Sequence, residues 1–180
     1  QIRQMALDSG FTNADKPDSQ DICFIPLGDY RSFLKEQVST KAGDIVDTAG
    51  TVLGQHQGIE FFTVGQRRRL GIAGGEPLYV LQLDAAANRV VVGPEEALYS
   101  DQMWVSRVNY TLGPAPVEPV DVGVKSRYKS EEAAARLSPR EDGALVRFDQ
   151  PQRAVTPGQA AVFYQGDVLL GGGIIEADIP

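Results

Sequence analysis

Short runs of alternating apolar and polar residues fill the chain from about residue 100 to its end. Alternation with a period of two residues is typical of β-strands that have one buried face. We therefore expect strands at 103–110, 120–128, 144–148, 160–164 and 168–176. The prolines around these runs are expected to separate the strands: Pro114, Pro116, Pro119, Pro139, Pro151 and Pro157. Several short antiparallel strands of this length predict a small barrel or a sandwich.

Helical and strand patterns alternate before residue 100. Ile2, Met5 and Ala6 have helical spacing and Gly10 stops the run, which predicts the last turns of a helix. A helix that starts uncapped at Gln1 indicates a piece of a longer protein. A native gene product with the mass of these 180 residues would refute that expectation.

Two hairpins are predicted in the same part of the chain. Residues 44–53 contain two short apolar runs and are expected to turn at Gly50. Residues 78–92 contain two longer runs and are expected to turn at Asn88. These hairpins predict a small β-sheet ahead of the barrel.

Several segments need a separate interpretation. Residues 22–25 alternate as a short strand does, and Asp29 can cap a short amphipathic helix. Residues 131–137 are ambiguous, because their alanines favour a helix while their position between strands favours a strand. Gly171–Gly173 lacks the strand-to-helix context of a phosphate loop, which predicts a bulge or a close approach of backbones. Gln165–Asp167 fits a tight hairpin turn.

The charge balance argues against non-specific binding of nucleic acid by the molecule as a whole. The formal net charge is −7. Of the residues, 42% are apolar and 23% are charged, as in ordinary globular proteins. Two local clusters depart from this acidic background: Arg67–Arg69 and Lys125–Lys129 each carry three cations. The second cluster also contains Tyr128, an aromatic ring that can stack on a base.

The cysteine count limits the chemistry that the chain can perform. Cys23 is the single cysteine, which rules out an internal disulfide framework and favours a reducing, cytoplasmic setting. With His56 as the single histidine, a zinc site within the chain is not expected. The sequence has no apolar run long enough to span a bilayer and no basic-then-apolar leader.

Local sequence alone leaves ordinary interpretations open for the candidate residues. Cys23 lies among apolar neighbours and is interpreted either as a small buried hydrophobe or as a nucleophile. The run Arg67–Arg69 suits a solvated surface as well as a phosphate-binding one. Arg127 and Tyr128 suit the rim of a strand end, and His56 without a nearby second ligand is most simply structural.

Five phrases in order point to a family. They are DSQDICFI at 18–25, GQHQG at 54–58, TVGQRRRLGI at 63–72, VTPGQAAVFY at 155–164 and LGGGII at 170–175. Each phrase is weak alone, but together they make the chain closely resemble the tRNA-specific 2-thiouridylases, which place sulfur on the wobble uridine of tRNA. Arg69 departs from the resemblance, because the family commonly has glycine there. The resemblance covers essentially the whole chain.

The resemblance implies an α+β fold with a small mixed central domain followed by an antiparallel β-barrel. Residues 1–28 would be the tail of a nucleotide-binding domain that contains the cysteine segment. Residues 29–99 would form the central domain, and residues 100–180 the barrel that docks tRNA. The family's nucleotide-binding domain carries a Ser-Gly-Gly-x-Asp-Ser loop for ATP and magnesium, and no such sequence occurs here. This chain alone is therefore expected to be inactive and to bind no cofactor.

The resemblance also assigns chemistry to Cys23. Family enzymes adenylate the C2 oxygen of the uridine, and a persulfide then attacks C2. By resemblance Cys23 is the persulfide carrier, loaded by a sulfur-donor protein of a cysteine desulfurase relay. An earlier cysteine, absent here, would release the sulfur by forming a disulfide with Cys23. A persulfide ionises more readily than a thiol, which makes it the better nucleophile at neutral pH.

The same resemblance gives the basic clusters a partner, the anticodon stem-loop of tRNA. Arg127, Tyr128 and Gln159 match family positions that contact tRNA. Arg67 and Arg68 are additional candidates from charge alone. Two other hypotheses remain open at this point: a non-catalytic RNA-binding barrel with a structural cysteine, and a β-domain that binds protein and no RNA.

Overall fold

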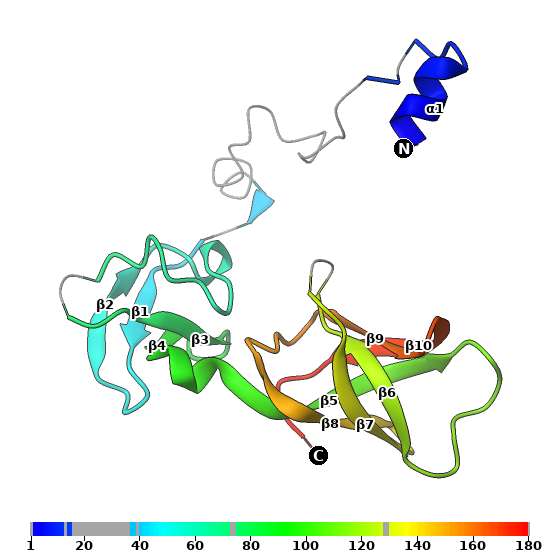
Figure 1. Ribbon diagram of the computed structural model, residues 1–180. Coiled ribbons are helices and arrows are strands. Elements are labelled where there is room, and N and C mark those ends of the chain that lie inside the picture. Colours follow the sequence, from blue (N-terminus) through cyan, green and yellow to red (C-terminus); the bar gives the residue numbers. More distant parts are fainter. Residues whose placement is uncertain are drawn as a thin grey trace. The chain divides into compact units, whose positions relative to one another are not determined.

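The computed structural model describes residues 2–12, 14–15, 37–38, 40–72, 75–127 and 130–179, which fall in two compact units, 1–40 and 41–180. The described part of the first unit contains the helix α1 (Ile2–Asp8), as Figure 1 shows. The helix ends where Gly10 takes a φ of 76°, a left-handed conformation that glycine adopts without strain. The predicted helix end is confirmed. The strand expected at 22–25 and the helix expected after Asp29 lie outside the described residues.

A four-stranded mixed sheet opens the second unit. Its strands are β1 (Gly43–Val46), β2 (Val52–His56), β3 (Tyr79–Asp84) and β4 (Arg89–Gly93), in the order β2-β1-β4-β3. Both predicted hairpins are confirmed as antiparallel pairs, and a parallel pairing of β1 with β4 joins them. Two short 3-10 helices, η2 (Ile59–Phe61) and η3 (Glu95–Leu98), lie in the connections.

The turns of the two hairpins show why these sequences form them. The Asp47 carboxylate accepts hydrogen bonds from the backbone N–H groups of Ala49 and Thr51, both at 2.8 Å. Gly50 has a φ of 86°, and Asn88 has a φ of 52° in the second turn. Glycine and asparagine are the residues that tolerate this region best.

A closed barrel of six antiparallel strands follows the sheet (Figure 1). Its strands are β5 (Tyr99–Tyr110), β6 (Val120–Lys125), β7 (Ala133–Arg140), β8 (Gly143–Arg153), β9 (Ala160–Gln165) and β10 (Val168–Ile175). They close in the order β10-β5-β8-β7-β6-β9, which decides between the expected barrel and sandwich. The predicted fold class, a small mixed domain followed by an antiparallel barrel, is confirmed.

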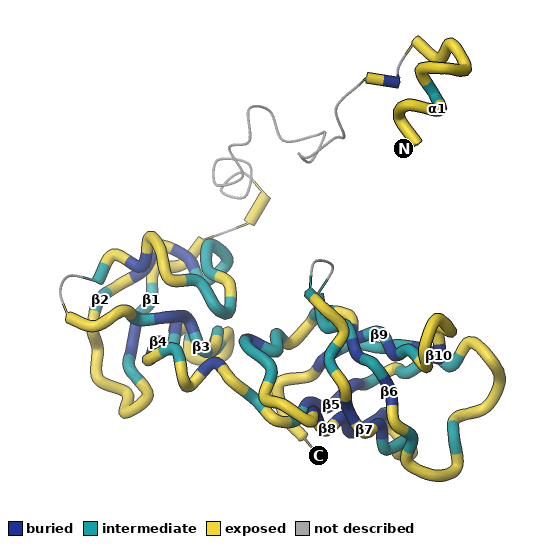
Figure 2. Tube along the Cα trace, viewed as in Figure 1, coloured by how far each residue is buried: buried dark blue, intermediate teal, exposed yellow. Residues whose placement is uncertain are grey.

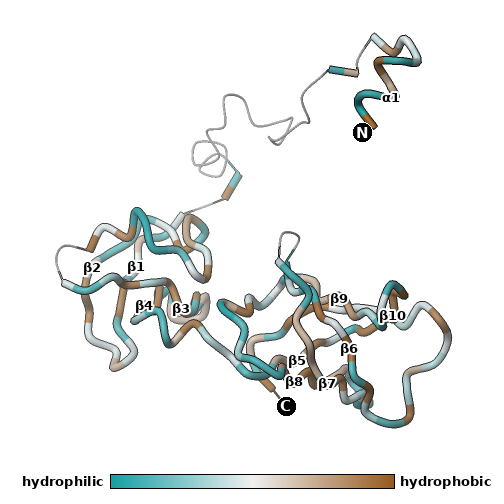
Figure 3. The backbone as a smooth tube through the Cα atoms, in the orientation of Figure 1, coloured by the Kyte–Doolittle hydropathy of each residue, from teal (hydrophilic) through white to brown (hydrophobic). Residues whose placement is uncertain are grey.

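The barrel core comes from the inward-facing residues of every strand. Phe163, Leu137, Ile175, Val105 and Val146 are almost completely buried. Burial of each such side chain contributes about 1.5–3 kcal/mol. Figure 2 shows the buried positions along the strands and the exposed ones in the connections, and Figure 3 shows hydrophobic residues recurring along the same strands. The alternation in the sequence therefore marks the inside of the barrel.

Several strand boundaries differ from the sequence predictions, and β8 extends to Arg153 instead of ending at residue 148. β5 begins at Tyr99 instead of residue 103, because Tyr99 pairs with Arg153. β6 ends at Lys125 instead of residue 128. The ambiguous segment 131–137 is resolved as a strand, since β7 pairs with β6 on one side and β8 on the other. Pairing on both sides overrides the helical preference of the alanines.

Two prolines expected between strands lie within them. Pro139 belongs to β7, but it lies beyond Leu137, the last β7 residue paired with β6. Pro151 belongs to β8 and lies at an irregularity, where Gln102 pairs with Arg147 and the next pairing is that of Ser100 with Gln152. At both positions the ladder of hydrogen bonds is absent on one side of the strand or is interrupted. Strands tolerate proline at such positions, because the N–H group that proline lacks is not needed there.

The triple glycine lies inside β10 and is not a phosphate loop. A Cβ at Gly171 or Gly173 would clash with the carbonyl oxygen of Asn109 or Ser106, and a Cβ at Gly172 would lie 2.6 Å from that of Ala161. The register shifts between Gly172 and Ile174. The predicted bulge with close approach of backbones is confirmed.

Candidate functional site

The strand registers bring two of the predicted contact residues to one end of the barrel. At this end β5, β7 and β9 begin and β6, β8 and β10 end; we call it the junction end. Arg127 follows the end of β6, and Gln159 precedes the start of β9. The chain enters the barrel here from the mixed sheet through η3 and Tyr99. Residues more than thirty positions apart in sequence therefore meet where the two β-structures join.

Arg127 is tied to the neighbouring chain at this end. Its Nη2 donates to the carbonyl oxygens of Ala154 and, at 3.4 Å, of Arg153. The carbonyl oxygen of Arg127 accepts from both the N–H and the hydroxyl of Ser130, at 3.2 and 2.9 Å. No hydrogen bond to a described residue uses its Nε or Nη1, so these donors are available to a ligand. Arg127 thus has a structural contact on one side of its guanidinium and free donors on the other.

Gln159 is held through its backbone. Its N–H donates to the carbonyl oxygen of Thr156 at 3.3 Å, and its carbonyl oxygen accepts from Ile175 at 2.8 Å. The side-chain oxygen Oε1 is buried and has no hydrogen-bond partner among the described residues. Such an unsatisfied polar atom is unusual in a folded protein. A ligand contact through Oε1 requires the side chain to rotate outward.

A second arginine, Arg153, joins the barrel to the mixed sheet. Its Nε donates to the Glu95 carboxylate at 3.0 Å, and its guanidinium lies 5.4 Å from the centre of the Tyr79 ring. The Tyr79 hydroxyl donates to the same carboxylate at 3.2 Å. The N–H of Ala154 donates to Leu98 in η3 at 2.7 Å. Arg153 was not predicted as a site residue, because nothing in its local sequence distinguishes it from a solvated arginine.

The predicted arginines Arg67 and Arg68 lie on the loop between η2 and β3. Gln66 fixes this loop: its side-chain oxygen accepts from Thr63 at 3.2 Å and its side-chain nitrogen donates to Arg68 at 2.8 Å. Gly65 and Gln66 also exchange backbone hydrogen bonds with Val80. Gly65 has a φ of 87°. A Cβ there would lie 3.2 Å from the Cβ of Ala154, so the loop starts against the junction end.

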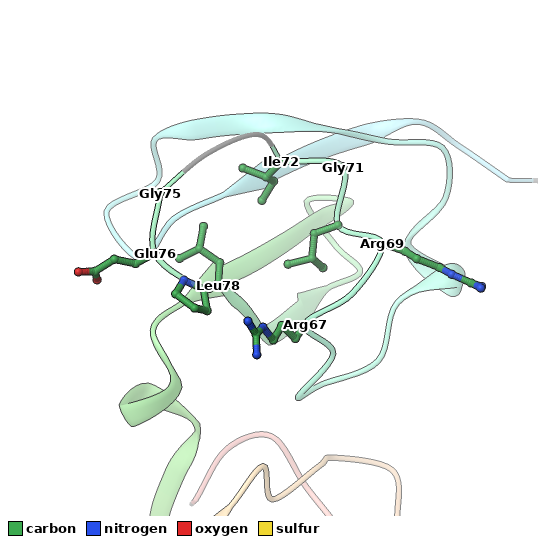
Figure 4. Close-up of a pocket in the computed structure, with 9 residues that line it drawn as sticks. Arg67, Arg69, Gly71, Ile72, Gly75, Glu76 and Leu78 are labelled. Carbon is green, nitrogen blue, oxygen red and sulfur yellow. The ribbon is translucent and has the colours of Figure 1, made fainter.

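The backbone turns at the third of the three consecutive arginines. All three are exposed, but Arg69 has a φ of 63° and turns the chain. Figure 4 shows the Arg67 side chain lying near Leu78, whereas Arg69 leaves the loop on another side. The pocket in this view has a volume of about 340 Å³, and Ile72 and Leu78 point into it. Arg67 and Arg69 therefore both line this pocket, although their side chains leave the loop in different directions.

A larger pocket lies at the junction itself. Its volume is about 520 Å³. We call it the junction pocket, and its lining residues come from the loop 62–64, from β3, from the segment 155–157 and from Ala177 and Asp178. The sequence motif at 155–164 overlaps this region, but only Gln159 was predicted from it as a site residue. The long-range contact of β3 with the segment after β8 left no signal in the sequence.

The structure does not report on every candidate. Cys23 and Tyr128 lie outside the described residues.

His56 is buried: its Nε2 lies 3.2 Å from the carbonyl oxygen of Asn88, and its ring packs edge-on against Phe62 at 5.6 Å between centroids. In the described part of the chain, no three His, Cys, Asp or Glu side chains gather to hold a metal ion. No helix among the described residues is long and apolar enough to span a membrane.

Comparison with known proteins matches both β-structures. The family described as "tRNA methyl transferase PRC-barrel domain" matches residues 31–94, and the one described as "Aminomethyltransferase beta-barrel domain" matches residues 100–175. The tRNA-specific 2-thiouridylase MnmA of Synechococcus sp. (strain JA-3-3Ab) is 50% identical over 182 residues, covering 100% of this chain and 49% of that protein.

Other relatives give the same result. The tRNA-specific 2-thiouridylases MnmA of Trichormus variabilis and Halothermothrix orenii are 48% and 46% identical, covering 97% and 98% of this chain and 50% of each relative. The chain thus spans about half the length of the curated relatives that it matches. Identity at this level over nearly all of its residues shows that the chain belongs to the tRNA-specific 2-thiouridylase family.

Proposed function

We propose that this chain is part of an ATP-dependent tRNA sulfurtransferase of the cytoplasm that converts the wobble uridine of tRNA to 2-thiouridine. The observation that carries the proposal is the identity of about half of its residues with proteins named tRNA-specific 2-thiouridylase. The chain would supply two parts of that enzyme: the surface that docks the anticodon stem-loop and the cysteine that carries sulfur.

The docking surface is proposed at the junction end of the barrel. Arg127 supports it, because Nε and Nη1 can bind phosphate oxygens while Nη2 keeps the side chain in place. Gln159 lies at the same end and would offer its amide to a ribose or a base edge. Tyr128 would stack on a base. RNA loops are recognised in this way, through phosphates and through unstacked bases.

Cys23 is proposed as the sulfur carrier. A donor protein would transfer one sulfur atom to the thiolate and leave a persulfide. The terminal sulfur of that persulfide would attack C2 of the activated uridine and displace the activated C2 oxygen with its leaving group. A second cysteine thiolate would then attack the Cys23 sulfur, which leaves the sulfur on the base and joins the two cysteines in a disulfide. A reductant or a further donor cycle would restore the thiols.

The described run Gly171–Gly173 does not fit a phosphate loop. Its backbone packs against Asn109, Ala161 and Ser106. We therefore assign the binding of ATP and magnesium to the nucleotide-binding domain that the family resemblance implies. No step of this proposal uses a cofactor bound by residues 40–179.

The experiment that tests this proposal is complementation. The native gene, its Cys23→Ser variant and a Ser19→Ala control are expressed in bacteria that lack their own thiouridylase, and 2-thiouridine in tRNA is measured by mass spectrometry. Wild type and Ser19→Ala should restore the nucleoside, and Cys23→Ser should not. Undiminished 2-thiouridine with Cys23→Ser would remove this cysteine from the mechanism. Failure of the wild type, with binding of the anticodon stem-loop intact, would favour a non-catalytic RNA-binding module.

A further inference from the structure

The junction pocket has the size and lining of a ligand site. Its volume of about 520 Å³ lies within the usual range for pockets that bind small molecules, about 300–1,000 Å³. Apolar walls come from Phe62, Leu81, Val155 and Pro157. Polar side chains interrupt them at Thr63, Gln82, Thr156 and Asp178, which suits a flat ring system with hydrogen-bonding groups on its edge.

One wall of the pocket is a fixed aromatic ring. Phe62 packs against the buried His56 ring with 5.6 Å between centroids and an interplanar angle of 62°. This contact restrains the ring orientation, and Phe62 also packs against the core of the mixed sheet. A restrained aromatic face is what a nucleobase stacks on in proteins that bind single-stranded RNA.

The polar groups of the pocket mostly accept hydrogen bonds. The Thr156 hydroxyl donates to the carbonyl oxygen of Ala154 at 2.9 Å, which leaves its lone pairs free to accept. The side chains of Gln82 and Asp178 have no hydrogen-bond or ion-pair partner among the described residues. A carboxylate repels a phosphate and accepts from an N–H group. The acceptors among these groups can bind a ligand edge that carries N–H donors, and the Gln82 amide can also donate.

Two arginines lie on chain segments that adjoin the pocket. Arg127 binds Ala154, the residue that precedes the pocket wall at Val155. Arg67 follows the pocket residues Thr63 and Val64 on the loop that packs against Ala154. Hydrogen-bonding side chains in the pocket and arginines on adjoining segments match a nucleotide, whose base carries N–H donors as well as acceptors and whose phosphates are anionic.

We infer that the junction pocket receives an unstacked nucleobase of single-stranded RNA, stacked on Phe62 and held at its N–H edge by Asp178 and Gln82. The inference rests on the proposed function, since it takes the RNA to be the anticodon loop. It adds a base-binding site on the described residues to the phosphate contacts proposed for Arg127. Stacking of one base is worth about 1–3 kcal/mol, or about 5- to 150-fold in affinity.

The test measures binding of the 180-residue chain to anticodon stem-loop RNA by fluorescence anisotropy at one fixed salt concentration. In a series of RNAs, each loop nucleotide in turn is replaced by an abasic one. Ala177→Phe is designed to fill the pocket from the exposed C-terminal segment. Phe62→Leu keeps an apolar side chain but removes the stacking face. Ala86→Phe places the same bulk on the exposed turn between β3 and β4 and serves as the control.

The inference expects one loop position at which the abasic replacement weakens wild-type binding at least fivefold. The Ala86→Phe control should show the same loss of affinity with the abasic RNA. Ala177→Phe and Phe62→Leu should show no such loss, because removal of a base cannot weaken binding to a pocket that no longer holds the base. Stem-loop binding with the same abasic profile in all four proteins would overturn the pocket while leaving RNA docking intact. Absence of stem-loop binding by the wild type and by Ala86→Phe would overturn RNA docking and the pocket together.

Discussion

Arg127 donates a hydrogen bond through Nη2 to the carbonyl oxygen of Ala154, a residue held at a φ of 51°. The N–H of Ala154 also donates to the carbonyl oxygen of Leu98, and the Ala154 side chain lies next to Gly65. One alanine therefore connects the barrel, η3 and the loop between η2 and β3. A non-glycine residue in the left-handed region persists only where its surroundings hold it. The Arg127 guanidinium is part of those surroundings and helps to fix the junction end.

Arg127→Ala is expected to lower the free energy of unfolding by about 2 kcal/mol, since hydrogen bonds to charged groups contribute about 1.5–3 kcal/mol. Arg127→Lys should keep part of this contribution. Urea unfolding followed by the fluorescence of Trp104, the single tryptophan and a buried residue of β5, measures the change. Arg140→Ala, an exposed arginine at the opposite end of the barrel, should stay within about 0.5 kcal/mol of wild type. Equal stability of the two alanine variants would contradict the structural role of Arg127.

Arg69 has a φ of 63°, in the left-handed region that favours glycine. A side chain in this region costs about 1–2 kcal/mol relative to glycine, part of which is offset by the greater freedom of glycine in the unfolded chain. Arg69→Gly should therefore stabilise the mixed sheet by about 0.5–1 kcal/mol. Hydrogen exchange of the amides of β3 and β4, read by mass spectrometry, should slow accordingly.

The matched control for this change is Arg68→Gly. Arg68 carries the same charge on the same loop, and its φ is not positive. Glycine should destabilise the loop there, because it gains freedom in the unfolded state without relieving strain. Equal exchange rates in the two variants would show that the conformation of Arg69 stores no strain.

The sequence predicted the strands better than their partners, for a physical reason. The alternation that marks β5 and β9 is a local property, imposed by one face of each strand lying in the barrel core. The parallel pairing of β1 with β4 joins segments about 45 residues apart, and the two hairpins carry no local signal of it. Residues 131–137 were undecided for the same reason, because the ladders with β6 and β8 determine their conformation.

The candidate site was predictable in part. The phrase around Gln159 directed attention to the segment before β9, and the cluster around Arg127 to the segment after β6. That the two meet at one barrel end follows from strand order, which the sequence patterns left open. Phe62 and Gln82 could not be selected, because a phenylalanine and a glutamine acquire a role only when folding brings β3 beside the segment 155–157.

Tyr110 makes barrel stability sensitive to alkaline pH. Its hydroxyl is buried without a hydrogen-bond partner among the described residues, and burial raises its pKa above 10.0. Below pH 10 the phenol is neutral in both states and the barrel has its full stability. Above pH 10 the unfolded chain ionises first, so stability falls as the pH rises toward the pKa of the folded state.

Tyr110→Phe should remove this part of the alkaline loss. Below pH 10 it should match or exceed wild type by about 1 kcal/mol, since it deletes an unsatisfied buried hydroxyl while the ring still packs against the core. Urea unfolding at several pH values up to 11.5, with Tyr99→Phe as a half-exposed control, measures both effects. A Tyr110→Phe variant that loses stability as steeply as wild type above pH 10 would assign the alkaline transition to other groups.

Arg67 and Arg68 are proposed to bind phosphates of the anticodon stem-loop, and salt dependence separates this role from packing. Each phosphate contact releases condensed counterions, so the slope of log K against log salt concentration changes by about 0.7–0.9 per contact. Arg67→Ala and Arg68→Ala should each flatten the slope by about that amount. Arg140→Ala, an exposed arginine at the opposite end of the barrel, should leave the slope unchanged. Unchanged slopes for Arg67→Ala and Arg68→Ala would show that neither side chain binds the RNA backbone, because a lost phosphate contact must change the number of counterions released. These exposed arginines would then contribute to solubility only.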